Sequence, residues 1–161
     1  MLIEKIPEWH LSPQDHTEIA SLLARCFTTD FGGRSFFTQP HDLRLIYRQG
    51  PIIAHIALLL RSVQLGDRLV TIAGLAEVAT EPAHRGQGLA ATLVQAAIAE
   101  ARTSPAEYLL LFGTAKLYTA AGFRNIPNQI AQVSDTSLMM LPVKDQPWPD
   151  TASLDLKGPC F

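Results

Sequence analysis

The residues with the clearest chemical potential lie between Glu77 and Ala90, where an apolar run ends, a loop with two glycines follows, and an amphipathic segment begins. Backbone amides freed by glycine, together with the positive end of a helix dipole, bind phosphate or pyrophosphate groups. Gly86 and Gly88 suit this role because a Cβ would hold phosphate oxygens away from the main chain. Arg85 adds a positive charge at the rim. The stretch is compatible with an anion-binding loop, although the glycines alone are more typical of a turn with no ligand.

Other nucleotide chemistries are not supported by this stretch. It lacks the dinucleotide fingerprint G-x-G-x-x-G, and no Lys-Ser/Thr pair follows the glycines as it would in a P-loop. Hydride transfer and nucleotide hydrolysis are therefore disfavoured. The chain has 13 Lys and Arg against 15 Asp and Glu, a formal charge of −2, so no global basic field exists to hold nucleic acid.

Hydrophobic periodicity predicts the elements that must position the loop. Ser12, Pro13 and Asp15 match the N-cap, the first helical position and the capping-box position of a helix. A second helix follows the loop at 89–102, where an apolar stripe lies opposite a polar face. The remaining expected elements are strands at 1–6, 43–48, 52–61, 69–80, 108–112 and roughly 130–143, and a short helix at 115–121 that Gly122 ends.

The order of these elements indicates the fold class. The segment 69–112 is strand, helix, strand, which requires two parallel strands in one sheet. The runs 52–60 and 69–79 are apolar at nearly every position, as expected of strands covered on both faces. Short turns at 49–51 and 66–67 predict antiparallel hairpins beside that unit. A chain of 161 residues with this pattern predicts a mixed α/β domain.

Cysteine usage and hydropathy indicate the compartment. Cys26 and Cys160 suggest no disulfide framework, and no Cys or His cluster has metal-ligand spacing, so no metal site is expected. The longest apolar run, 52–60, contains His55 and is shorter than the roughly 20 residues that a bilayer requires. The N-terminus lacks the basic and apolar regions of a signal peptide. We therefore expect a cytoplasmic protein without a membrane or nucleic-acid partner.

Two signatures resemble those of the GCN5-related N-acetyltransferases (GNAT). Arg85-Gly-Gln-Gly-Leu-Ala90 resembles the Arg/Gln-x-x-Gly-x-Gly/Ala signature, and it lies between a predicted strand and a long helix, as in that family. Residues 108–123 resemble the second signature, a strand and a short helix that end in aromatic-x-x-x-Gly-Phe. The resemblance covers roughly residues 1–143, which we expect to form the GNAT domain, with 144–161 as a C-terminal tail.

The resemblance implies a fold and a cofactor. The fold is a mixed, mainly antiparallel sheet flanked by helices, in which a central parallel pair of strands, 69–80 and 108–113, splays apart. Acetyl-CoA lies between these strands, and its acetyl group passes directly to an amine. The pantetheine arm would run beside Val78, Ala79 and Thr80. The pyrophosphate would rest on the amides of Arg85, Gly86, Gln87, Gly88, Leu89 and Ala90.

The resemblance also assigns two catalytic roles. Tyr118 matches the tyrosine that protonates the departing thiolate, and a phenol with a pKa near 10 is of suitable acidity. Glu77 lies in the strand where related proteins carry the carboxylate that deprotonates the amine. Each residue also has a structural interpretation: Tyr118 as packing for the short helix, and Glu77 as a partner of a bulge or of neighbouring backbone. His55 and His84 are weaker candidates for the base, His55 being more typical of a core histidine, and Glu81 is expected to be a solvated loop charge.

The acceptor is the least determined part of the expectation. The tail and the hairpin from Gln49 resemble the aminoglycoside 2′-N-acetyltransferases, and the tail also resembles the nodulation N-acyltransferases. In those proteins the tail folds toward the acceptor site, where Asp145, Asp150, Asp155 and the terminal carboxylate would face an aminosugar; a tail that only packs or is disordered is the alternative. The acidic residue of the aminoglycoside enzymes lies one place away from Glu77, and one place along a strand reverses the face.

The leading expectation is an acetyl-CoA-dependent N-acetyltransferase that acts on a primary amine of a small molecule, with an aminosugar as one option. Alternatives are transfer of a longer acyl chain, acetylation of a protein or peptide, and a non-catalytic acyl-CoA-binding sensor. A homodimer is one option for its assembly.

Overall fold

An eight-stranded sheet with the order β1-β2-β3-β4-β5-β7-β6 organises the chain, and β8 pairs with β3. The structure, a computed structural model, describes residues 2–126, 137–149 and 152–161. The helices are α1 (Pro13–Cys26), α2 (Leu89–Thr103) and α3 (Lys116–Ala120), with single 3₁₀ turns at Glu8–His10 and Pro82–His84. The strands are β1 (Ile3–Pro7), β2 (Leu43–Arg48), β3 (Ile52–Leu65), β4 (Arg68–Thr80), β5 (Tyr108–Phe112), β6 (Arg124–Asn125), β7 (Leu138–Pro142) and β8 (Leu154–Asp155).

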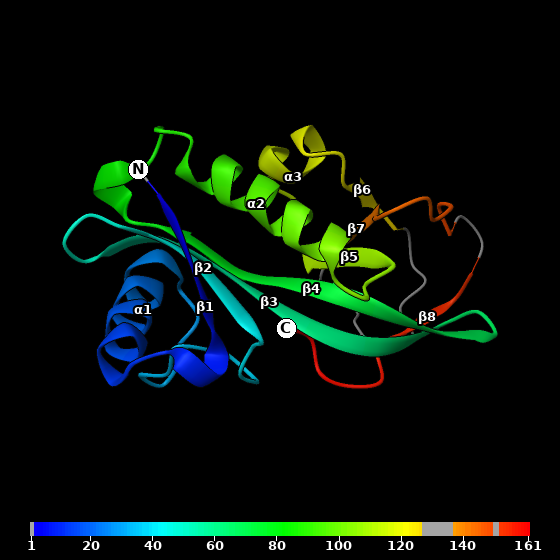
Figure 1. Cartoon of the computed structure of the whole chain (residues 1–161), viewed down its shortest axis with the longest axis horizontal. Helices are drawn as coiled ribbons and strands as arrows, with labels where there is room; N and C mark the ends of the chain where they lie inside the picture. The colour runs from blue at the N-terminus through cyan, green and yellow to red at the C-terminus, as the bar shows by residue number, and fades with distance from the viewer. Residues whose placement is uncertain (1, 127–136, 150–151) are drawn as a thin grey trace.

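Helices cover both faces of the sheet, which is why β3 and β4 lack an alternating polar pattern. Figure 1 shows α2 and α3 above β3 and β4, and α1 and the C-terminal segment below them. The core under α2 contains Leu93, Val94 and Ala97 against Leu45 and Ile56. On the opposite face, α1 packs over one end of the sheet and the segment 152–161 over the other.

The N-terminus of α1 forms as the sequence predicts. Ser12 Oγ accepts a hydrogen bond from the Asp15 amide, the Asp15 carboxylate accepts one from the Ser12 amide, and Pro13 occupies the first turn. This capping box fixes where the helix begins and satisfies amides that have no partner within it.

The parallel strand pair is confirmed, and it pairs over a short length. β5 pairs with β4 from Ile72 opposite Tyr108 to Leu75 opposite Leu111. On its other side, β4 remains paired with β3 as far as Thr80. The edge of β4 that faces β5 therefore has no strand partner from Ala76 to Thr80 in the described part of the chain. The two strands separate at the level of Glu77.

Several element boundaries differ from the expectation. β3 extends to Leu65 because it continues into a hairpin with β4, and the C-terminal segment adds the short strand β8 to its end. The strand expected at roughly 130–143 is observed as β7, Leu138–Pro142, and residues 127–136 lie outside the described part of the chain. A two-residue strand, β6, pairs with β7 and was not predicted, since two residues carry no periodicity.

Candidate active site

Tyr118 is held by the short helix α3 and its C-terminal cap. Gly122 has a φ of 99°, and its amide donates to Thr119 O while the Phe123 amide donates to Tyr118 O at 3.0 Å, the pattern of a Schellman motif. The Phe123 ring packs edge-on against the Tyr118 ring, with centroids 6.2 Å apart. Gly113 passes close on the other side, where a Cβ would lie 3.2 Å from the Tyr118 ring. Burial raises the pKa of the Tyr118 phenol, so the hydroxyl keeps its proton at neutral pH.

Glu77 lies on a β-bulge of β4, at the level where β4 and β5 separate. Its φ of 54° and the register shift between His55 and Ala57 on β3 turn its side chain away from the regular alternation of the strand. The side chain is only 6% exposed. Its Oε1 accepts a hydrogen bond from the Phe37 amide at 2.8 Å. Glu77 therefore tethers the loop after α1 to the sheet.

A fully buried arginine lies behind Glu77. Arg44, on β2, donates to both carboxylate oxygens of Glu8 at 2.7 and 2.9 Å and to Ser35 O at 2.8 Å. Its Nη1 also lies 3.5 Å from Glu77 Oε2. Burial, the largest single effect, raises the pKa of Glu8, but the hydrogen bonds and the charge of Arg44 outweigh it, and the net pKa is lowered. One guanidinium thus faces two carboxylates, as a buried cation requires.

His41 also lies close to the Glu77 carboxylate. Its Nε2 lies 3.0 Å from Glu77 Oε2, within ion-pair distance, but the two atoms are not aligned for a hydrogen bond. Its ring is 1% exposed, and within the described residues neither ring nitrogen has a hydrogen-bond partner. A buried polar group without a partner is uncommon, and this one adjoins the carboxylate expected to act as the base.

The other candidate bases either have hydrogen-bond partners already or do not line the cavity. Fully buried His55 donates from Nδ1 to Glu77 O at 2.9 Å and accepts at Nε2 from Arg44 Nη1 at 3.1 Å, which fixes one neutral tautomer. Burial and then the Arg44 charge hold its pKa well below the ordinary value, so it is a satisfied core histidine. Glu81 was expected to be a solvated charge, but it accepts two hydrogen bonds from Arg25, at 2.6 and 2.9 Å. His84 is half-buried beside the glycine loop.

Glu77 and Tyr118 line the same cavity. It has a volume of about 210 Å³ and lies between the loop after α1, the end of the β4–β5 pairing and the C-terminal segment. Its lining is Phe27, Thr29, Phe31, Phe37, Leu75, Ala76, Glu77, Val78, Phe112, Tyr118 and Phe161. A glutamate and a tyrosine that keeps its proton therefore line one space, and these residue types can take a proton from one reactant and give a proton to another.

The glycine loop has a geometry that suits anion binding. Gly86 and Gly88 both have a φ of 78°, and Gly88 is the N-cap of the fifteen-residue helix α2. Among the described residues, the amides from Gly86 to Ala90 donate to no backbone or side-chain acceptor, and the loop itself is exposed. A pyrophosphate fits this site because unpaired amides and the positive helix end coincide there. Arg85 donates from Nε to Thr80 O at 3.2 Å, which keeps its guanidinium beside the loop.

The edge of β4 between Glu77 and the glycine loop also has unused polar capacity. Val78 lines the cavity, Ala79 is buried against the α1 side, and Thr80 Oγ1 is buried without a hydrogen-bond partner in the described part of the chain. Because β5 does not reach this edge, an extended amide-containing chain fits beside it as a further strand would.

Sequence reasoning did not identify three contributors to the site: the aromatic loop residues, the pair His41 and Arg44, and Phe161. Arg44 could have been found from the sequence, because a charged residue within the apolar run of 43–47 needs a buried partner. Nothing in the sequence indicates that Phe161 lies beside Gly74, because these residues are distant in the chain.

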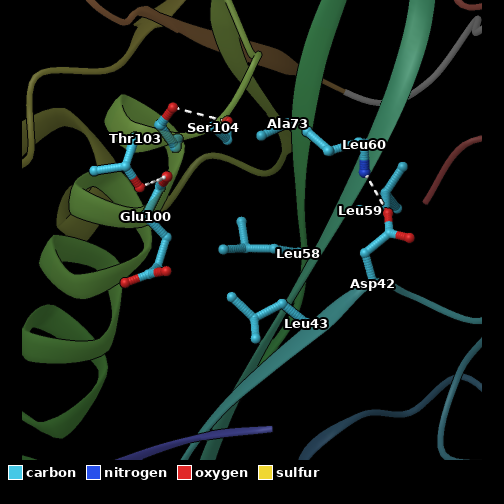
Figure 2. A pocket seen from close by; sticks show the side chains of 10 residues that line it. Asp42, Leu43, Leu58, Leu59, Leu60, Ala73, Glu100, Thr103 and Ser104 are labelled. Carbon is cyan, nitrogen blue, oxygen red and sulfur yellow. Dashed lines mark hydrogen bonds between the residues drawn. The ribbon is translucent and has the colours of Figure 1, made fainter. Parts of the chain in front are cut away.

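A second cavity, of about 170 Å³, lies at the C-terminal end of α2 (Figure 2). Leu43, Leu58 and Leu60 line it from β2 and β3, while Glu100 and Thr103 line it from α2. Glu100 forms an ion pair with Lys5, and Asp42 accepts a hydrogen bond from the Leu60 amide. Its lining shares no residue with the cavity of Glu77 and Tyr118.

The fold is that of the acyl-CoA-dependent N-acyltransferases. The chain is similar to a GNAT family N-acetyltransferase, YhbS, from Escherichia coli in complex with CoA, with a TM-score of 0.71, 21% identity, and coverage of 96% of this chain and 88% of that chain. It is also similar to a GNAT family acetyltransferase from Brucella melitensis in complex with acetyl-CoA (TM-score 0.63, 20% identity, 94% and 95% covered). A third similar structure is the ribosomal-protein-S18-alanine N-acetyltransferase from Escherichia coli, with a TM-score of 0.63, 17% identity, and coverage of 91% of this chain and 97% of that chain.

The family is defined by sequence as well as by fold. Residues 10–126 match the sequence model of the acetyltransferase (GNAT) domain, and the chain belongs to this family. It is a GNAT N-acetyltransferase, and acetyl-CoA is its acetyl donor. A search of curated proteins finds no match. Within the described residues, no helix is long and apolar enough to cross a membrane.

Proposed function

We propose that this protein transfers the acetyl group of acetyl-CoA directly to a primary amine of a small molecule. The observation that carries the proposal is the shared cavity of Glu77 and Tyr118 at the point where β4 and β5 separate. An acid and a base are both needed, because the amine loses a proton as the new N–C bond forms and the sulfur gains one as the C–S bond breaks.

In this proposal, one set of residues binds acetyl-CoA and another carries out the two proton transfers. Amides from Gly86 to Ala90 would hold the pyrophosphate, with the Arg85 guanidinium at the rim, whereas the Arg85 amide, which was expected to take part, donates to Pro82 O. The edge at Val78, Ala79 and Thr80 would hydrogen-bond the pantetheine arm. Acetyl-CoA supplies an acetyl group activated as a thioester. Tyr118 donates its proton to the sulfur, and Glu77 accepts the proton of the amine, directly or through water. Arg44 and His41 position the Glu77 carboxylate from behind.

An amine screen tests this function. Free thiol released from acetyl-CoA is measured with the full chain against a panel of small amines, aminosugars, polyamines and peptides, and the product is examined by mass spectrometry for an added acetyl group on nitrogen. We expect amine-dependent thiol release with at least one small amine. Tight binding of acetyl-CoA with no release for any amine would favour a sensor, release only with peptides would favour a protein N-acetyltransferase, and faster turnover with longer acyl-CoA would favour an N-acyltransferase.

A further inference from the structure

The cavity of Glu77 and Tyr118 has largely aromatic walls. Five phenylalanines line it: Phe27, Phe31, Phe37, Phe112 and Phe161. They come from the end of α1, the loop after it, the end of β5 and the C-terminal segment. The rings contact one another, since Phe27 and Phe31 have centroids 5.5 Å apart, Phe31 and Phe37 5.6 Å, and Phe112 and Phe161 5.2 Å. Walls of this kind bind flat apolar groups by stacking and edge contacts.

Phe161 forms one wall of the cavity and is held in place by contacts with the sheet and with the loop after α1. Its ring lies over Gly74 of β4 so closely that a Cβ there would be 2.6 Å from a ring atom. Arg61 of β3 lies over the same ring at 5.3 Å and donates to Pro159 O. Thr38 Oγ1 donates to Cys160 O at 2.8 Å, which ties the C-terminal segment to the loop after α1. Phe161 is therefore a built part of the cavity.

Among the described residues that line the cavity, one side chain carries a carboxylate. Glu77 is the acidic residue of the lining. Of the tail side chains that we expected to face an aminosugar, Asp150 lies outside the described residues, Asp145 and Asp155 are not part of the lining, and Asp155 pairs with Lys157 at 2.9 Å. A single carboxylate suits a single ammonium group, whereas a polycation would leave its other charges against phenylalanine rings, which is costly.

The cavity volume matches a ring with a short arm. An apolar cavity of about 150 Å³ admits benzene. The observed volume of about 210 Å³ leaves room for a few further atoms. An amine nitrogen at the end of a two-carbon arm would then be able to approach Glu77 while the ring contacts the phenylalanines.

We propose that the acceptor is an arylalkylamine, a primary amine on a short alkyl arm attached to an aromatic ring, and that Phe161 and Phe37 determine this specificity. The inference rests on the proposed acetyl transfer. It names the substrate class of the same cavity and assigns a specificity role to the C-terminal segment.

Initial rates of thiol release at saturating acetyl-CoA test the substrate class. The probes are phenethylamine, butylamine, glucosamine and spermidine. We expect kcat/KM for phenethylamine to exceed that for glucosamine and spermidine at least tenfold, since a lost apolar contact in a pocket is worth about 10- to 200-fold in discrimination. A higher kcat/KM for glucosamine or spermidine than for phenethylamine would overturn the proposal.

Three variants test the assigned residues. Phe161→Ala and Phe37→Ala should each lower kcat/KM for phenethylamine about tenfold or more, change that for butylamine little, and leave KM for acetyl-CoA unchanged. Phe37 is 43% exposed, so its removal keeps the fold intact even where loss of Phe161 loosens the C-terminal segment. Phe36→Ala is the matched control, because Phe36 belongs to the same loop but not to the lining. Equal loss with butylamine and phenethylamine in both variants would contradict the specificity role.

Calorimetry separates this inference from the proposed function. Phenethylamine is titrated into the full chain saturated with CoA, a measurement that needs no turnover. Binding that Phe37→Ala weakens supports the inference even if no amine is acetylated. Acetylation of other amines without detectable phenethylamine binding overturns the inference and leaves the proposed function standing.

Discussion

The surroundings of Tyr118 suit the proton donation that we propose for it. The Schellman motif, the Phe123 ring and the close approach of Gly113 fix the phenol at the cavity, and burial raises its pKa above the ordinary value of about 10. A raised pKa keeps the proton on the phenol across the working pH range, so proton donation declines only in strongly alkaline solution.

Tyr118→Phe should therefore reduce kcat about 10²- to 10⁴-fold and leave the affinity for acetyl-CoA nearly unchanged. The phenol acts as charge develops on the sulfur, and the ring that packs against Phe123 is retained. Steady-state kinetics from pH 7 to 10.5 checks this, and the alkaline decline of kcat should disappear in the variant. A wild-type kcat in Tyr118→Phe with any accepted amine would remove the proton-donor role. Tyr108→Phe serves as the control, since the Tyr108 hydroxyl donates to Pro147 O outside the cavity.

His55 makes stability depend on pH. Burial and the Arg44 charge hold its folded pKa well below 6.5, the value expected in the unfolded chain, so the unfolded state binds the proton first as pH falls. The contribution of neutral His55 to the free energy of unfolding should be fully present above about pH 6.5. Below that pH the free energy of unfolding should decrease, by at most about 1.4 kcal/mol per pH unit. Urea unfolding between pH 5 and 8 measures this slope. The pKa of Glu8 is lowered from 4.5, so its contribution is lost at lower pH and does not overlap.

His55→Gln is expected to flatten that slope, because glutamine does not titrate. An unchanged slope in a folded His55→Gln protein would assign the pH dependence to another group. His10→Gln is the matched control, since His10 is exposed.

At the scale of elements, the junction of β4, the glycine loop and α2 is the cofactor site that we propose. Gly88 ends the loop with a φ of 78° and begins α2, and the amides around it have no acceptor in the described part of the chain. A Cβ at Gly88 would meet open space, so the conformation itself, rather than crowding within the protein, calls for glycine.

Gly88→Val should weaken acetyl-CoA binding at least tenfold, because a β-branched residue disfavours the positive φ that aims the amides and places methyl groups toward the anion. Calorimetric titration with acetyl-CoA measures this. Gly50→Val is the matched control: Gly50 has a φ of 74° in the β2–β3 turn, with nothing near its Cβ position, so it reports the strain alone. Equal affinities in wild type and Gly88→Val would exclude this loop as the pyrophosphate site.

At the scale of the whole molecule, Arg61 connects parts that are far apart in the chain. Its guanidinium donates to Gln39 Oε1 at 2.6 Å and to Pro159 O, and it lies over the Phe161 ring. Burial lowers the pKa of Arg61 from 12.5, but the group remains a cation at any physiological pH. The loop after α1 and the C-terminal segment are thereby joined across β3, around the cavity.

Arg61→Met should loosen both segments together and leave the rest of the fold unchanged, since methionine keeps apolar bulk and removes the donors. Hydrogen exchange should become about tenfold faster or more at amides of 35–39 and 154–161, with no change in α2. Arg68→Met is the control, because Arg68 is largely exposed and only weakly paired with Glu107. Faster exchange in one segment alone would show that Arg61 does not couple them.

The sequence by itself determined the local structure and the chemistry that local structure carries. The capping box at Ser12, the glycine loop before α2, the Gly122 cap and the parallel pair of β4 and β5 all follow from residues close together in the chain or from periodicity. Tyr118 was identified as a candidate because it occupies a motif position, and Glu77 because it is a carboxylate in the strand where related proteins carry the base. The alternative for Glu77, a carboxylate that bonds neighbouring backbone, also describes its bond to the Phe37 amide.

Only the tertiary structure decided what surrounds those residues. The pairing of Arg44 with Glu8 and Glu77, the position of His41 and the packing of Phe161 on Gly74 join residues tens of positions apart. No periodicity encodes such contacts, because they depend on how elements pack and on where a bulge turns one side chain. The sequence therefore predicted an acetyltransferase fold and its donor, whereas the aromatic walls around the cavity of Glu77 and Tyr118 arise from long-range packing.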